Sequence, residues 1–239
     1  MGRLLKVYLK NIFQQKTYYI CMGISLAMAV ILPFILGLFI KTTDTITFAD
    51  RVVDCFKIDL IVIVFIALFV CSDFTDGTAK NFIARGYTRR QILYGKYIAS
   101  LISIFVYFLV GLLFTFIFFA KDGINFTSTD FLKIIAALVT AVATTGLYVI
   151  ISNTAEKIST AIIITILLFT SFGLMLDGIE HLLKLKFDLS NYWIANLNNL
   201  MTAKDAGIMD LLKVVGVAGI YLIILFELSN FIIKKKEVK

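Results

Sequence analysis

The segment 73–96 holds the residue types and spacings that most strongly indicate a defined binding surface. Ser72, Asp73 or Thr75 can cap a short helix, because a side-chain oxygen can accept a free N–H group of its first turn. Gly86 can end this helix in the left-handed conformation that often follows a helix C-terminus. The pattern predicts a short helix followed by a tight turn, an ordered surface suited to binding rather than to covalent chemistry.

The same segment predicts how the next helix begins. Thr88 and Gln91 have the spacing of a capping box, in which each side chain satisfies the backbone N–H of the other residue. Phe74, Phe82 and Ile83 give the short helix apolar faces that could dock on a protein or on the membrane. An ordinary basic loop is the alternative interpretation of this segment.

Glu227 is the acid that lies deepest in an apolar run, about two turns of helix before Lys234. Acids inside membrane-spanning segments are costly, so they are functional hypotheses by default. The alternatives are that the side chain snorkels toward the headgroups or pairs with a neighbouring helix. His181 is the only histidine, and alone it is expected to be a surface residue rather than a base or a ligand.

The sequence contains no P-loop, zinc-metalloprotease or serine-hydrolase motif. Its three cysteines are too few and too scattered for a disulfide framework or a zinc site, and they stand at Cys21, Cys55 and Cys71. We therefore expect no cofactor and no metal on this chain, and no enzymatic activity of its own.

The composition determines the class of protein that must position these residues. Of 239 residues, 60% are hydrophobic and 16% are charged, against about 25% charged in an average soluble domain. Too few polar side chains are present to cover a soluble core. The composition thus excludes a cytosolic enzyme, a nucleic-acid-binding module and a disordered protein, and it predicts a protein that crosses a membrane several times.

Several runs reach the roughly 20 mostly apolar residues that a transmembrane helix needs. The run 52–72 is included although Asp54, Lys57 and Asp59 lie in its first half, since they could sit at a headgroup boundary or face other protein. The predicted fold is all-α, one transmembrane domain over 1–239 with six membrane-spanning helices at about 18–40, 52–72, 97–120, 131–151, 158–176 and 211–233.

The distribution of basic residues orients the predicted spans. With six spans, 14 of the 23 Lys and Arg residues fall on the side that holds both termini and the segment 73–96. Lys and Arg concentrate in cytoplasmic loops of membrane proteins. We therefore predict that both termini and this segment are cytoplasmic, and that the net charge of +7 is a topology signal rather than a sign of nucleic-acid binding.

Two further patterns concern packing. The range 1–17 is predicted to be an amphipathic helix in the cytoplasmic headgroup region, or simply the basic flank of the first span; its apolar stripe is Leu5, Tyr8, Leu9, Ile12 and Phe13. The run 131–151 carries small residues at helical spacing, which permits close helix packing and is interpreted as a packing seam. These small residues are Ala136, Ala137, Thr140, Ala141, Thr144 and Thr145.

The segment 73–96 also resembles a family motif. Its successive pieces are similar to the signature E-x-G-T-x-K-N, G-x-S/T-R-x-x-I, G/A-K of ABC-2-type permeases; they read Asp76-Gly77-Thr78-Ala79-Lys80-Asn81, Gly86-Tyr87-Thr88-Arg89-Arg90-Gln91-Ile92 and Gly95-Lys96. A departure is that Asp73 and Asp76 stand where that family often has Glu. The Gly-Thr-x-Lys-Asn form most resembles the branch of bacitracin and lantibiotic self-protection permeases and phenol-soluble modulin exporters.

The resemblance implies that the segment 73–96 is a coupling helix, which in that family docks into a groove on a separate ATP-binding subunit that holds ATP and Mg. The resemblance assigns the coupling role to nine residues of this segment: Phe74, Asp76, Gly77, Thr78, Lys80, Asn81, Phe82, Ile83 and Gly86. The resemblance also implies a type V exporter fold with short re-entrant helices in the outer segment 177–210. Tyr192 and Trp193 in that segment suit a membrane–water boundary.

The expected function is that of a permease subunit of an ATP-driven exporter in the bacterial cytoplasmic membrane. Six spans would be half of a twelve-span pathway, so a second copy or a related permease is expected as a partner, along with membrane lipids. The apolar, Phe-rich spans favour an amphipathic or lipid-like cargo over a small ion. The resemblance implies an amphipathic or antimicrobial peptide, or a lipid-like or drug cargo. The alternatives are a membrane-embedded enzyme acting on lipid or peptide, which would need paired acids or a histidine constellation, and an ion-coupled secondary transporter, which would show repeats and broken helices.

Overall fold

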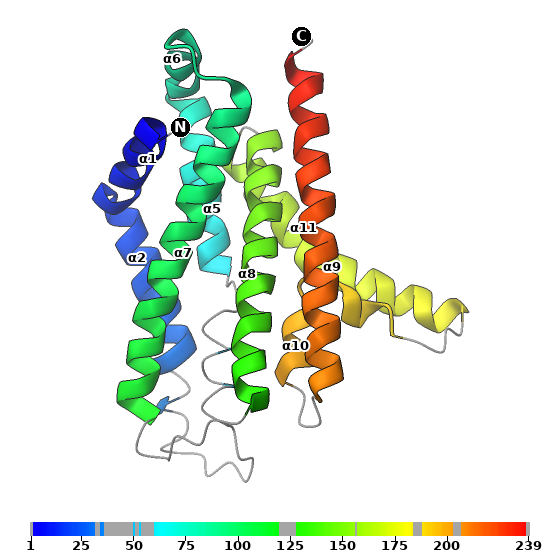
Figure 1. Ribbon diagram of the computed structural model, residues 1–239. Helices are drawn as coiled ribbons and strands as arrows, with labels where there is room; N and C mark the ends of the chain where they lie inside the picture. Colours follow the sequence, from blue (N-terminus) through cyan, green and yellow to red (C-terminus); the bar gives the residue numbers. More distant parts are fainter. Residues whose placement is uncertain are drawn as a thin grey trace.

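The computed structural model describes residues 2–31, 34–35, 50, 53, 60–119, 128–155, 157–183, 188–202 and 207–237. These residues form helices, with no strand among them, in agreement with the predicted all-α class. Figure 1 shows the helices arranged side by side, with the N-terminus, α6 (Thr78–Ala84) and the end of α11 (Ile208–Glu237) at the same end of the molecule.

Within the described residues, four helices are long and apolar enough to cross a membrane. They are α7 (Arg89–Phe119), α8 (Ser128–Ala155), α9 (Ile158–Leu183) and α11 (Ile208–Glu237). By length and composition they fit a multi-pass membrane protein, as the sequence predicts. Each extends beyond its predicted apolar run, because helical hydrogen bonding continues through polar residues at the ends.

The first two predicted spans are described only in part. The described helices are α2 (Lys16–Leu26), its π-helical continuation η1 (Ala27–Ile31), α5 (Leu60–Thr75) and α6 (Thr78–Ala84). The α2–η1 unit is a shorter apolar helix, whereas α5 and α6 together pass as one span bent by 61°. Most of the remainder of the predicted spans 18–40 and 52–72 lies outside the described residues. The described residues therefore do not test the prediction of six spans.

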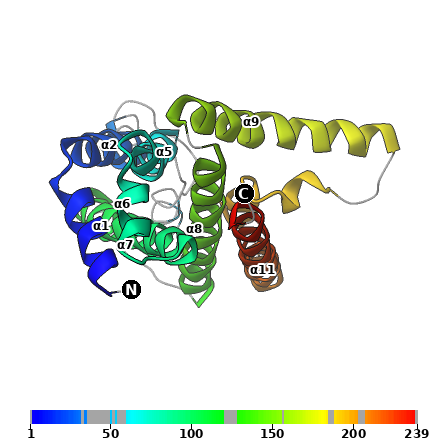
Figure 2. The same ribbon diagram turned by 90° about the horizontal axis from the view of Figure 1, so that it is seen from above.

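Helix α8 forms the centre of the bundle. It contacts α5, α7, α9 and α11. It is also the most buried of the four long helices: 61% of its most apolar 18-residue stretch is buried, against 17–28% in the other three. Viewed from above, α8 lies between the group of α2, α5 and α7 and the helix α11 (Figure 2). The other long helices therefore leave most of their apolar surface facing outward, as lipid-facing helices do.

The small residues of α8 allow this central position. Ala136, Ala137 and Ala141 are buried in a cluster with Val214 and Ala218 of α11, so the helices meet closely. The threonines of the same stripe are buried and donate to carbonyl oxygens within their own helix, which leaves no unsatisfied hydroxyl at the contact; they are Thr140, Thr144 and Thr145. The predicted packing seam is confirmed.

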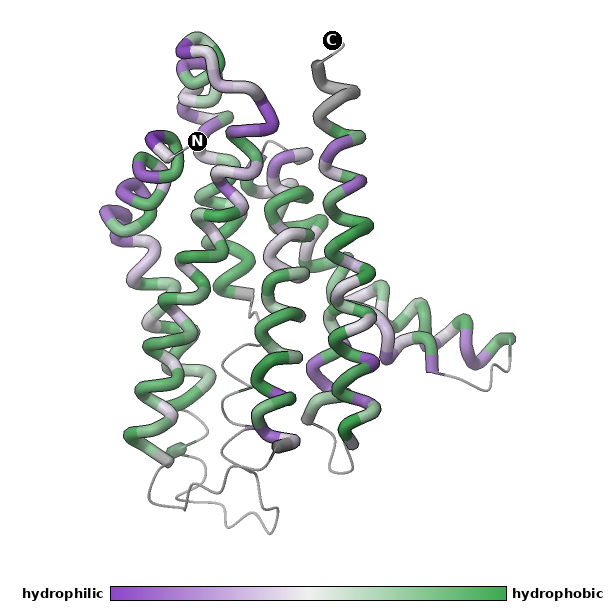
Figure 3. The backbone as a smooth tube through the Cα atoms, in the orientation of Figure 1, coloured by the Kyte–Doolittle hydropathy of each residue, from purple (hydrophilic) through white to green (hydrophobic). Residues whose placement is uncertain are grey.

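Helix α9 departs from the simple upright span expected over 158–176. It continues to Leu183, crosses the bundle obliquely and projects beyond α11 (Figures 1 and 2). The projecting part exposes large apolar side chains, with Leu174 71% and Leu182 84% exposed. Figure 3 shows that most residues of the long helices are hydrophobic, whereas polar residues gather toward the end that holds α1 (Gly2–Gln14) and α6.

The described residues 188–202 fold back onto the bundle. After α9, the 3-10 turn η3 (Ser190–Tyr192) leads to the short helix α10 (Leu197–Thr202), which contacts α8 and α11. Trp193 is only 8% exposed and packs on Phe172 with ring centroids 4.5 Å apart. Trp193 therefore packs inside the bundle, among side chains of α9 and α11, whereas Tyr192 is 40% exposed.

Candidate functional site

The turn that follows α6 is a complete Schellman motif. Gly86 has a φ of 87°, the backbone conformation that favours glycine. The Tyr87 N–H donates to the Phe82 carbonyl oxygen at 3.1 Å, and the Gly86 N–H donates to that of Ile83 at 2.9 Å. The rings of Tyr87 and Phe82 meet edge to face at 6.1 Å, which supplies the apolar contact of the motif. The predicted left-handed Gly86 is confirmed.

Helix α7 then begins with the predicted capping box. The Thr88 N–H donates to Gln91 Oε1 at 3.0 Å, and the Gln91 N–H donates to Thr88 Oγ1 at 3.3 Å. Two otherwise free backbone donors are thereby satisfied reciprocally. Because the Schellman motif ends where the capping box begins, α6 joins α7 through a short connection in which each backbone N–H group from Arg85 to Thr88 has an acceptor.

The start of α6 differs from the prediction. Gly77, with a φ of 68°, precedes the helix, and no side chain caps it. The prediction that Ser72, Asp73 or Thr75 caps α6 is wrong, because all three belong to the last turns of α5. The hydroxyls of Ser72 and Thr75 donate to α5 carbonyl oxygens, and the Asp73 Oδ1 atom accepts the hydroxyl of Thr78 at 2.8 Å.

We call α6 and its turn into α7, residues 78–91, the α6 hairpin. A buried polar network lies directly beneath this hairpin. It consists of Tyr8, Asp73, Thr78 and Lys96, and we call it the Asp73 network. The Lys96 ammonium lies 3.1 Å from Asp73 Oδ2 and donates to the Val70 carbonyl oxygen at 2.6 Å. The Tyr8 hydroxyl donates to the same Asp73 Oδ2 at 3.0 Å. Four helices meet there, since these side chains come from α1 (Gly2–Gln14), α5, α6 and α7.

The network satisfies its charges internally. Lys96 has no exposed surface, and its ammonium also lies 4.8 Å from the centre of the Phe74 ring. Burial, and secondly the charge and hydrogen bond of Asp73, raise the pKa of Tyr8, so its hydroxyl stays protonated and remains a donor. A buried charge without a partner is strongly destabilising, so each member depends on the others.

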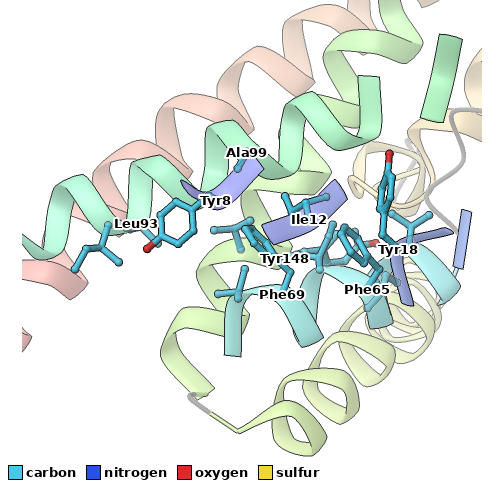
Figure 4. Close-up of a cluster of buried hydrophobic side chains, with 14 of the residues drawn as sticks. Tyr8, Ile12, Tyr18, Phe65, Phe69, Leu93, Ala99 and Tyr148 are labelled. Atoms are coloured by element: carbon cyan, nitrogen blue, oxygen red, sulfur yellow. The ribbon is translucent and has the colours of Figure 1, made fainter. Parts of the chain in front are cut away.

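Helix α1 packs on the protein rather than only on lipid. Its buried face is Leu4, Tyr8 and Ile12, while its basic residues are exposed. A Cβ atom on Gly95 of α7 would lie 3.1 Å from the Tyr8 ring, so glycine permits this close approach. Figure 4 shows Tyr8 and Ile12 among side chains of α5 and α7. The amphipathic helix is confirmed, and its apolar face is covered by α5 and α7.

Phe82 points into the molecule. Its ring meets Tyr8 at 5.6 Å and Tyr87 at 6.1 Å, as a partly buried member of the cluster around α1. The expectation that Phe82 supplies an exposed docking surface is therefore wrong, because α1 occupies the face of α6 on which it lies. Ile83, the next residue, is 44% exposed and points outward.

The other predicted site residues divide between an inner and an outer face. Thr78 belongs to the Asp73 network, Phe74 lies against Lys96, and Gly77 shapes the bend between α5 and α6. The outer face consists of exposed residues: Asp76, Lys80, Asn81, Ile83 and Gly86. This face combines an acid, a base, an amide and one branched apolar side chain on a rigid support, which is the chemistry of a polar protein-binding surface.

Sequence reasoning missed the Asp73 network. The pairing residues are one acid at the end of α5 and one lysine in the first turns of α7, each next to an apolar run. Opposite charges at the facing ends of consecutive predicted spans were the signal that could have indicated the pair. Of the two acids in the motif, Asp73 is the buried one, whereas Asp76 is exposed.

Glu227 lies on the exposed surface of α11. In the part of the chain that the structure describes, no side chain forms a hydrogen bond or ion pair with it. Over the same ranges, no group of three His, Cys, Asp or Glu residues could hold a metal ion.

Comparison with known proteins gives a single result. No curated protein and no solved structure matches the chain. A family model described as a protein of unknown function, DUF2705, matches residues 7–239, which include the Asp73 network, the α6 hairpin and all four long helices. The chain therefore belongs to the DUF2705 family.

Proposed function

We propose that this chain is the membrane-spanning permease subunit of an ATP-driven exporter of the ABC-2 type. In this proposal α6 is the coupling helix, and its outer face docks on a separate ATP-binding subunit. The single observation that carries the proposal is the Asp73 network, which fixes an exposed helix to α1, α5 and α7 at once. A movement imposed on α6 would pass into three other helices, whereas a flexible loop would absorb it.

The short connection to α7 supports the same role. The Schellman motif and the capping box give every backbone N–H group of the connection, from Arg85 to Thr88, an acceptor. Force applied at the outer face of α6 would therefore act on the long helix α7 through hydrogen bonds rather than through a loop. The apolar Ile83 would anchor the interface, and the charged Asp76 and Lys80 would determine its orientation.

The proposed location is the bacterial cytoplasmic membrane, with both termini and α6 in the cytoplasm. The support is the asymmetry of basic residues, together with the position of α1, α6 and the end of α11 at one end of the molecule (Figure 1). A cysteine at Thr88, which is exposed, tests this topology. It should resist an impermeant maleimide added outside intact cells, and labelling there would contradict the cytoplasmic placement.

The proposal includes a second copy or a related permease as partner and an amphipathic peptide, lipid-like molecule or drug as cargo. The support is the extent of exposed apolar surface on α7, α9 and α11. Glu227 would act at such a surface, because it is exposed on α11. We expect Glu227→Gln to lower export without lowering the amount of protein in the membrane.

The docking proposal is tested by purifying the chain, with an affinity tag, from membranes of its own host. We expect an ATPase subunit with a P-loop to co-purify with the wild-type chain, and Ile83→Asp to abolish its recovery. Val7→Asp is the matched control, since Val7 of α1 is 43% exposed and lies off α6. Equal recovery of the ATPase with wild type and Ile83→Asp would overturn the assignment of α6 as the coupling helix.

A further inference from the structure

A cavity of about 250 Å³ lies between α7, α8 and α11 and is partly open to the surface of the bundle. It is separate from the Asp73 network, since none of that network's members lines it. Its walls are almost entirely apolar, and the lining residues used below are Tyr94, Tyr97, Gly146, Leu225, Phe226 and Ser229.

The polar atoms around the cavity are already satisfied by the protein. The Tyr94 ring stacks on Phe226 at 6.1 Å, and its hydroxyl donates to Asn230 Oδ1 at 3.3 Å. The Tyr97 hydroxyl donates to the Val142 carbonyl oxygen at 3.1 Å, and the Ser229 hydroxyl donates to that of Phe226 at 2.7 Å. The cavity therefore offers its occupant apolar contact and no hydrogen bonds, which suits a hydrocarbon chain and not a polar solute.

Glycine keeps the floor of the cavity open. Gly146 of α8 is buried, and a Cβ atom there would lie 3.4 Å from Leu225 and 3.5 Å from the Tyr97 ring. These are ordinary contact distances, so a methyl group fits but a longer side chain would extend into the cavity. The cavity thus depends on the absence of a side chain at one position.

A positive charge stands at one end of the cavity. Arg90 lies one turn before Tyr94 and two turns before Tyr97, so it is on the same stripe of α7, and it is exposed. The distance along the helix axis from Arg90 to Tyr97 is about 10 Å. Glu227 does not line the cavity, because it lies about 100° around α11 from Phe226.

We propose that this cavity binds part of one acyl chain of an anionic phospholipid whose phosphate group lies at Arg90. The apolar walls match the chain, and the basic beginning of α7 matches the negative headgroup. The proposal is independent of the ATP-driven function, since it needs neither α6 nor a partner subunit. A bound lipid would fill the space between α7 and α11 and thereby fix their separation.

The probes are dioleoyl phosphatidylglycerol and dioleoyl phosphatidylcholine, added to the purified full chain and detected as retained adducts by native mass spectrometry. We expect wild type to retain phosphatidylglycerol in preference to phosphatidylcholine, and Gly146→Leu to reduce phosphatidylglycerol retention by at least about tenfold by filling the cavity. Leu222→Trp, which fills it from α11, should do the same. Gly216→Leu is the control, because Gly216 of α11 is exposed with open space around it.

The headgroup is tested by Arg90→Gln, which should reduce the preference for phosphatidylglycerol by about fivefold. Circular dichroism and elution volume show whether each variant keeps its fold. If Gly146→Leu does not keep its fold, Leu222→Trp tests the cavity in its place. Unchanged retention in Gly146→Leu and Leu222→Trp, or an equal loss in Gly216→Leu, would overturn the site. Equal retention of the two lipids by wild type, or an unchanged preference in Arg90→Gln, would overturn the anionic headgroup.

Discussion

The ammonium of Lys96 lies 3.1 Å from the Asp73 carboxylate with no exposed surface, at the point where α5, α7 and α1 meet beneath α6. The pair joins the end of one apolar helix to the beginning of the next. Tyr8 and Thr78 complete it by donating to the two oxygens of the same carboxylate. The exposed face of α6 is thus connected to the bundle by polar contacts in which the charged and polar side chains are paired with one another.

The first prediction concerns this ion pair. Lys96→Met should lower the free energy of unfolding by about 3–5 kcal/mol, because it leaves a buried carboxylate without its counter-charge. The double variant Asp73→Leu, Lys96→Met should recover most of that loss, since it removes both charges. Thermal unfolding of the purified protein in detergent measures both. A double variant less stable than Lys96→Met would contradict the coupling between the two residues.

The second prediction concerns the turn after α6. Gly86→Val should destabilise the hairpin by about 1–2 kcal/mol, because an L side chain is strained at a φ of 87°. Gly86→Asn should cost less, since asparagine tolerates the left-handed region. Hydrogen exchange of the Tyr87 amide, which donates to Phe82, reports the loss directly. Equal protection in the valine and asparagine variants would show that the turn is not held by its backbone conformation.

The third prediction concerns the contact between α1 and α7. Gly95→Leu should displace α1, since even a Cβ atom would lie 3.1–3.3 Å from Tyr8 and Leu4. The control is Gly23→Leu, because Gly23 on α2 is exposed and a Cβ atom there would have no neighbouring atom within 4 Å. Limited trypsin cleavage at Lys6 and other basic residues of α1 should increase only in the first variant. Equal cleavage of both would show that α1 is not held at Gly95.

The fourth prediction separates the two neighbouring apolar residues of α6. Phe82→Ala should destabilise the protein by about 2 kcal/mol, because its ring packs on Tyr8 and Tyr87. Ile83→Ala should leave the stability within about 0.5 kcal/mol of wild type, because the side chain is exposed. Thermal unfolding measures both, and the reverse order of effects would mean that α6 packs on α1 through its other face.

Local signals in the sequence determined the turn that ends α6 and the beginning of α7. Gly86 needs no distant partner to adopt a positive φ, and Thr88 and Gln91 cap each other across three positions. The amphipathic stripe of α1 and the small residues of α8 are likewise visible in helical periodicity. Each of these features is produced by residues within one or two turns, so their spacing alone is informative.

Only the tertiary structure decided which faces are covered. Tyr8 and Asp73 are 65 positions apart, and no local spacing indicates that α1 lies against α5 and α7 at Gly95. That packing turns Phe82 inward and makes Asp73, rather than Asp76, the buried acid. Likewise, the course of α9 encloses Trp193, because the direction in which a long apolar helix leaves a bundle depends on neighbours far away in the sequence.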